Sequence, residues 1–233
     1  MDPAAPRPSV EAADDQHRLF AFTLERVVLF SDAVFAIAIT LLAIDLRVPE
    51  LSPGQTDDSF LRALAALWPS VVAFGISFVT IAAFWVGHYR TFRYIVDVDG
   101  RLLVINLAFL FSVAILPFPT SIIAREGDLA SAAVIYALFV IAIGVLSTLL
   151  WLYPAQVAHL VSPGVTPEIA RQVTMRASII PIVFALSIPA ALVAPALAWV
   201  LWALAAPIQA VVTRRHPPGG SLGLRPRLGH RGQ

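Results

Sequence analysis

Four long stretches without a charged residue decide what this chain can fold into. They are Ala63–Gly87, Leu102–Ala124, Leu129–Tyr153 and Ala177–Thr213. A helix needs about 20 mostly apolar residues to cross a bilayer, and each stretch reaches that length. Only 13% of the residues are charged, whereas soluble domains carry about 25%. The sequence therefore predicts an all-α integral membrane protein.

The composition and the missing motifs argue against several other classes of protein. The net charge of +1 gives no indication of a nucleic-acid partner, and the lack of cysteine excludes disulfides and thiolate metal sites. No zinc-protease, serine-hydrolase or P-loop motif occurs, and His88 has no second histidine at metal-ligand spacing. We therefore expect neither an enzyme nor a metal or other cofactor.

Six membrane helices fit the chain better than five. The last uncharged stretch has 37 residues, about 55 Å as one helix, which is too long for a single span. A turn at residues 189–195 would divide it in two. With six helices, thirteen of the sixteen arginines fall on the side that holds both termini. The positive-inside rule then predicts that both termini are cytoplasmic.

The remaining segments are expected to be simpler. We expect a disordered cytoplasmic tail at residues 1–22 and the six-helix membrane domain at residues 23–213. We expect a second disordered tail, which is basic and cytoplasmic, at residues 214–233. Residues 47–59 predict a polar loop. Thr166 followed by Pro167 is typical of a helix start and predicts a short helix leading into Arg176.

The first membrane helix is unusual because its uncharged part, Ala33–Ile44, has only 12 residues. To span the bilayer it must begin near Leu24 and include Arg26 and Asp32. An ionisable residue inside a span is costly and normally faces protein or a water-filled path. We therefore look for function first on this helix.

One face of this helix has two possible interpretations. Helical spacing places Ile37, Thr40, Leu41 and Ile44 together, while the opposite face is equally apolar. The stripe could pack against a neighbouring helix, which periodicity alone favours. Alternatively, copies from several subunits could line a narrow pore, since apolar constrictions gate channels by dewetting. Asp45, at the far end, is either a carboxylate at the pore mouth or a solvated helix end.

Polar residues of three predicted helices fall at a similar depth in the membrane. They are Arg26, Ser31 and Asp32 on the first, Trp85 and His88 on the second, and Asn106 on the third. We expect a buried hydrogen-bond network in which Asp32 accepts from His88 or Asn106. Such a network could lock the helices together or act as a proton relay, and locking is favoured.

The motif Arg26-x-x-x-Phe30-Ser31-Asp32, followed by Ala-Val-Phe-Ala-Ile-Ala-Ile-Thr-Leu-Leu, resembles the signature of the transmembrane protein 175 family of potassium-permeable channels. The likeness extends through Trp85, His88, Asn106 and the Pro117-Phe-Pro119-Thr120 segment. A chain with one six-helix unit is similar to prokaryotic members of this family. The resemblance implies a homotetramer in the plasma membrane, with potassium as the permeant ion.

The resemblance also implies roles for individual residues. Ile37, Leu41 and Ile44 match the pore constriction on the first helix, and Thr40 matches a hydroxyl layer tied to cation preference. The residues that hold the helices in register would be Arg26, Phe30, Ser31, Asp32, Trp85, His88 and Asn106. Two other functions stay open: a proton-coupled transporter of small solutes with Asp32 and His88 as the relay, and a membrane scaffold subunit.

Overall fold

A computed structural model describes residues 10–47, 56–157 and 159–215. In these ranges nearly all residues are helical. The elements are α1 (Val10–Leu41), the 3-10 helix η1 (Leu42–Asp45), α2 (Asp57–Ala65), α3 (Trp68–Phe92), α4 (Gly100–Ala114), α5 (Pro117–Glu126), α6 (Ala130–Gln156), α7 (Pro167–Val193) and α8 (Pro195–Arg215).

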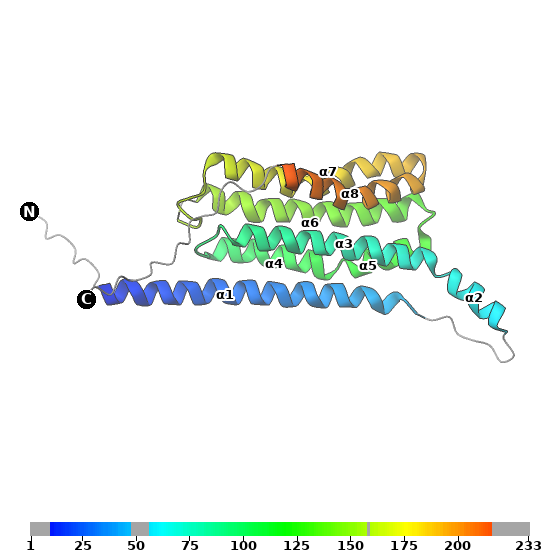
Figure 1. The fold of residues 1–233 in the computed structure, drawn as a ribbon, viewed down its shortest axis with the longest axis horizontal. Coiled ribbons are helices and arrows are strands. Elements are labelled where there is room, and N and C mark those ends of the chain that lie inside the picture. Colours follow the sequence, from blue (N-terminus) through cyan, green and yellow to red (C-terminus); the bar gives the residue numbers. More distant parts are fainter. Residues whose placement is uncertain (1–9, 48–55, 158, 216–233) are drawn as a thin grey trace, which may run out of the picture.

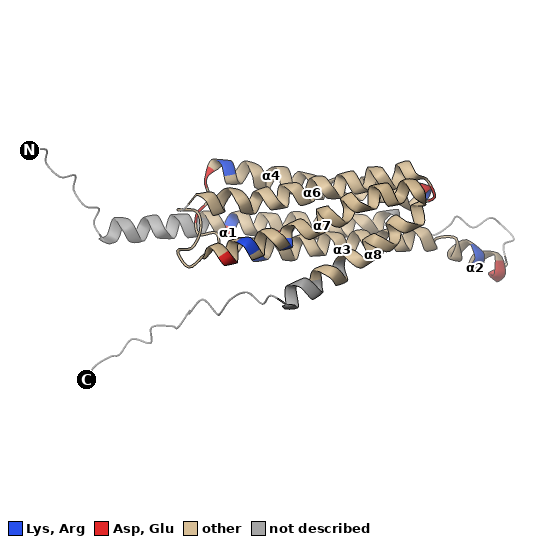
Figure 2. Cartoon of the chain, turned by 90° about the horizontal axis from the view of Figure 1, so that it is seen from above, with Lys and Arg blue, Asp and Glu red and all other residues tan. Residues whose placement is uncertain are grey.

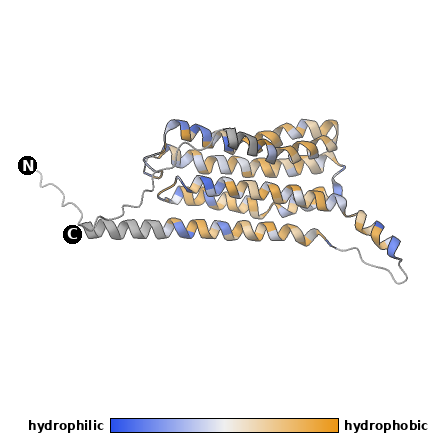
Figure 3. Ribbon diagram, viewed as in Figure 1, coloured by the Kyte–Doolittle hydropathy of each residue, from blue (hydrophilic) through white to orange (hydrophobic). Residues whose placement is uncertain are grey.

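The helices lie side by side in an elongated bundle with α1 along one edge (Figure 1). Next to α1 come α3 and the α4–α5 pair, then α6, and then α7 and α8 at the opposite edge. Most charged residues lie toward the two ends of the helices (Figure 2), and apolar residues predominate in the middle (Figure 3). This distribution matches a bundle whose middle lies in hydrocarbon.

Within the described ranges, five segments are long and apolar enough to cross a membrane: Thr23–Ile44, Asp57–Phe92, Gly100–Glu126, Ala130–Gln156 and Pro167–Val193. The apolar part of α8, Pro195–Gln209, is shorter. The prediction of an all-α membrane fold is confirmed. A sixth span formed by α8 stays a prediction.

Helix breaks next to proline residues occur inside the third span and between the fifth span and α8. Pro117 begins α5 after a break at Ile115 and Leu116, because proline cannot continue the hydrogen bonding of α4. The break between α7 and α8 is at Ala194, whose backbone is extended, inside the predicted turn. The predicted short helix before Arg176 is the first part of α7, which begins at the predicted Thr166 cap.

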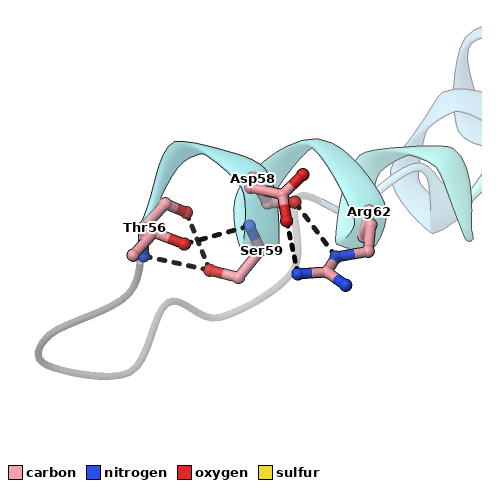
Figure 4. Close-up of polar contacts among 4 residues, drawn as sticks. All are labelled: Thr56, Asp58, Ser59 and Arg62. Atoms are coloured by element: carbon pink, nitrogen blue, oxygen red, sulfur yellow. Dashed lines mark hydrogen bonds and ion pairs between the residues drawn. The ribbon is translucent and has the colours of Figure 1, made fainter.

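Two expected irregular segments contain helix. The expected tail at residues 1–22 was wrong from Val10 onward, where α1 begins, because Ala, Glu and Arg residues there favour helix. The predicted polar loop at 47–59 was wrong from Asp57, where α2 begins. Thr56 and Ser59 cap α2 reciprocally (Figure 4), and Asp58 pairs with Arg62 one turn later.

The predicted C-terminal tail was wrong at its first two residues, Arg214 and Arg215. α8 continues through Arg214 to Arg215. The rest of the predicted tails, residues 1–9 and 216–233, lies outside the described residues.

Candidate functional site: the two faces of α1

One face of α1, continued by η1, is buried against α3 and α4. Phe35 and Leu42 are only 1% and 2% exposed, and Ser31 and Ala38 are also buried. These four residues recur every three or four positions, which places them on one side of the helix. This side holds α1 on the bundle.

The other face of α1 and η1 carries the predicted stripe, and it is exposed. Ile37 and Ile44 are each 58% exposed, and Leu41 and Thr40 are exposed beside them. The periodicity left open whether this stripe packs against a neighbouring helix of the same chain. Among the described residues it does not, because the described helices of the bundle cover the opposite face.

The Thr40 hydroxyl donates its proton in a hydrogen bond within α1. Its Oγ1 donates to the carbonyl of Ile37, one turn earlier, at 2.9 Å. The hydroxyl oxygen keeps its lone pairs on the exposed side of the helix. This oxygen could therefore accept a hydrogen bond from water or face a cation.

A chain of buried hydrogen bonds joins α3, α4 and α1. Asn106 Nδ2 donates to Ser31 Oγ at 3.1 Å, and Asn106 Oδ1 lies 3.0 Å from His88 Nε2. Ser31 Oγ in turn donates to the Val27 carbonyl at 2.8 Å. Since Asn106 Oδ1 can only accept, His88 Nε2 must be the donor, so every bond in the chain has a defined direction.

The His88 ring is enclosed by three phenyl rings. Phe92 stacks on it with ring centroids 4.3 Å apart, Phe109 lies parallel at 5.8 Å, and Phe35 of α1 meets it edge-on at 5.7 Å. This enclosure fixes the ring's orientation and therefore the direction of its bond to Asn106.

Asp32 takes a different donor from the ones expected. Its Oδ1 accepts from Trp85 Nε1 at 2.8 Å, so the prediction of His88 or Asn106 as the donor was wrong. Consecutive helical residues point about 100° apart. With Ser31 directed at Asn106, Asp32 lies at the seam between α1 and α3, where Trp85 reaches it.

Arg26 and Phe30 lie on the exposed side of α1. Phe30 precedes Ile37 by seven residues, which is two helical turns, so the two side chains share a face. The expectation that Phe30 joins the network between helices was therefore wrong for the single subunit.

No sequence motif indicated a second polar cluster, which lies between α3, α5 and α6. Ser77 of α3 lies 2.9 Å from the hydroxyl of Tyr136 in α6, and Thr120 of α5 donates to Ser77 at 2.8 Å. All three side chains are buried. Isolated hydroxyls inside three apolar stretches were the available signal for this cluster, which joins α3, α5 and α6.

Comparison with known proteins identifies the family. The family model described as "Endosomal/lysosomal potassium channel TMEM175" matches residues 26–117. A protein of Streptomyces collinus named a potassium channel is 40% identical over 156 residues, covering 65% of this chain and 74% of its own length. The chain belongs to the TMEM175 family.

Two further relatives support membership of the TMEM175 family. A potassium channel of Chamaesiphon minutus is 36% identical over 140 residues, 59% of this chain and 68% of the relative. The crystal structure of a lysosomal potassium-selective TMEM175 homologue from Chamaesiphon minutus superposes with a TM-score of 0.68 at 28% identity. It covers 83% of this chain and 97% of the homologue. The residues matched by the family model, 26–117, include α1 from Arg26 onward. They also include His88 and Asn106, which form the buried hydrogen bonds to Ser31.

Proposed function

We propose that this protein is a potassium-permeable channel in which α1 from each of four identical subunits surrounds a central pore. The carrying observation is that α1 exposes Ile37, Thr40 and Leu41 while its opposite face is buried. The TMEM175 relatives that are named potassium channels support potassium as the permeant ion.

The proposed pore needs several subunits. α1 lies at the edge of the bundle (Figure 1), and its exposed stripe has no covering helix among the described residues of the same chain. Copies arranged about an axis would bring these stripes together. Ala33, Ala36 and Ala43 are also exposed, and small residues allow helices to approach closely in a membrane.

Ion passage would be controlled by an apolar throat. Rings of Ile37, Leu41 and Ile44 would leave a constriction that resists wetting, and narrow apolar constrictions gate channels in this way. Thr40 lies between the first two rings in sequence. Because its proton is held by the Ile37 carbonyl, its oxygen would face a partly dehydrated cation.

We also propose a plasma-membrane topology with six spans and both termini cytoplasmic, α8 being the sixth. The arginine distribution supports this orientation, since thirteen of sixteen would lie on the cytoplasmic side. A relay through Asp32 and His88 has less support, because their described hydrogen bonds go to Trp85 and Asn106.

Ion flux into liposomes tests the proposed function. Purified protein should carry potassium, and Ile37→Asn should raise the flux and reduce the preference for potassium over sodium, because a polar ring replaces a dewetting one. Ile182→Asn is the matched control. Ile182 in α7 is 56% exposed, almost as much as Ile37 at 58%, but it lies on a helix away from α1. Unchanged flux in Ile37→Asn, or an equal change in the control, would contradict the proposal.

A further inference from the structure

A cavity of about 240 Å³ lies between α3 and α7, at the end of the bundle where α3 ends and α7 begins. Ser147 of α6 and Gln209 of α8 also line it. The cavity is separate from the exposed stripe of α1, because no residue of α1 lines it. It is thus a candidate binding site that pore formation does not use.

Three arginines give the cavity its charge. Arg90 and Arg93 come from the end of α3 and its following turn, and Arg176 comes from α7. The Arg90 charge lies close enough to act on the Arg176 guanidinium. None of the described residues that line the cavity is Asp or Glu. The three positive charges repel one another. An anion bound among them would offset this repulsion and would be attracted by all three.

The deeper wall of the same cavity is apolar. Phe84 and Ile180 are buried, and Ala83 and Ala177 lie beside them. α3 and α7 belong to predicted membrane spans, so the cavity is at the level where hydrocarbon meets the head groups. A guanidinium rim above an apolar wall suits an amphiphile better than a freely soluble anion.

Gly87 keeps the cavity open. It lines the cavity, and a Cβ built on it would meet no heavy atom within 4 Å. A side chain at this position would therefore begin in open space beside the cavity lining. This makes Gly87 a position where the cavity can be filled while the surrounding packing is kept.

We propose that this cavity binds the phosphate head group of an anionic phospholipid. Guanidinium groups of Arg90, Arg93 and Arg176 hold the phosphate, since their planar donors match its oxygens. Thr91 and Ser147 also line the cavity, and their hydroxyls would supply further donors. The start of the acyl chains lies against the apolar wall formed by Phe84 and Ile180.

Native mass spectrometry of the purified full-length protein tests this proposal. The protein is delipidated, incubated with phosphatidylglycerol or phosphatidylcholine, and the retained lipid is counted. We expect phosphatidylglycerol to be retained preferentially and Gly87→Leu to abolish the preference. Each arginine near an anionic membrane surface contributes about fivefold in affinity. Arg90→Gln combined with Arg176→Gln should therefore weaken binding on the order of twentyfold.

The control variant is Arg101→Gln, which removes an exposed arginine of α4 that does not line the cavity. An equal loss in this variant would assign the binding to general surface charge and overturn the proposal. Equal retention of the two lipids would overturn it as well. Inorganic phosphate and glycerol 3-phosphate are added as competitors. Displacement of the lipid by inorganic phosphate at equal concentration would identify a site for free phosphate instead.

Should Gly87→Leu not assemble, the arginine variants still decide the outcome, because Arg90 is exposed and Arg176 is only half-buried. The measurement does not depend on ion conduction. A channel that conducts without lipid preference would refute only the lipid site, and a lipid-binding protein without flux would refute only the proposed function.

Discussion

Trp85 Nε1 donates to Asp32 Oδ1 at 2.8 Å and so joins α3 to α1 beside the buried bond between Asn106 and Ser31. The carboxylate is half-buried, and the indole ring is partly open and stacks on Tyr89. The bond therefore holds α1 at the edge of the bundle without being deeply buried itself.

Removing this bond should weaken the subunit by about 1 kcal/mol. Bonds to charged groups contribute about 1.5–3 kcal/mol, and the partial exposure of Trp85 lowers this value. Asp32→Ala and Trp85→Phe should each lower the unfolding midpoint of the purified protein, and the double variant should be less destabilised than the sum. A double-mutant cycle with no coupling would show that the bond contributes nothing.

Replacing Asn106 should be more damaging. Asn106→Ala removes both of its bonds and leaves the buried His88 Nε2 and Ser31 Oγ without a partner on α4, at a cost of about 1–3 kcal/mol. Ser112→Ala, on the same helix, is the control, because the Ser112 hydroxyl bonds only to the Ala108 carbonyl among its described contacts. Equal unfolding midpoints of the two variants would contradict the expectation.

Gly144 should tolerate no side chain. A Cβ there would lie 2.7–2.8 Å from ring atoms of Pro181, so Gly144→Ala should force α6 and α7 apart and cost about 1–3 kcal/mol. Gly75→Ala is the matched change in α3, where a Cβ would meet no atom within 4 Å. It should be neutral or slightly stabilising, because alanine favours helix. Chemical denaturation of both variants checks this contrast.

The N-cap of α4 should make stability depend on acidity. The Tyr153 hydroxyl, and then the Leu102 backbone N–H, hydrogen-bond to the Asp99 carboxylate and lower the pKa of that group. Because its pKa is lower in the folded state, Asp99 stabilises the protein at pH values above the pKa of an unfolded Asp, about 3.9. This contribution is lost as the pH falls through the folded-state pKa.

The unfolding midpoint should therefore fall more steeply below about pH 4 in the natural protein than in Asp99→Asn, whose side chain does not titrate. Tyr153→Phe, which removes the first donor, should have an intermediate slope. Identical slopes in all three proteins would exclude this contribution of Asp99.

Periodicity identified which residues of α1 share a face but could not tell which face the bundle covers. Ile37 and Phe35 are equally apolar, so only the packing of α3 and α4 distinguishes them. The donor to Asp32 was missed for a similar reason. Trp85 and His88 are three residues apart and share one side of α3, so a modest rotation of that helix decides which of them reaches α1.

Other features depend on contacts between distant parts of the chain. Arg90 and Arg176 belong to separate predicted spans, and nothing in their local sequence indicated that they line one cavity. α2 was missed because Thr56 and Ser59 form a capping box without the usual glutamate or glutamine. The similar membrane depth of the polar residues, in contrast, correctly predicted that Ser31 and Asn106 lie in one network. Membrane spans restrict where a polar group can find a partner.

The directed bonds from His88 through Asn106 to Ser31 set the rotational phase of α1. A rotation by one residue, about 100°, would withdraw Ser31 from Asn106 and turn the large Phe35 ring out of its enclosure. No such penalty attaches to the apolar contacts of Leu42, which tolerate small rotations because dispersion has no direction. The Ser31 hydroxyl thus selects which side chains, two and three turns later, are presented to the outside.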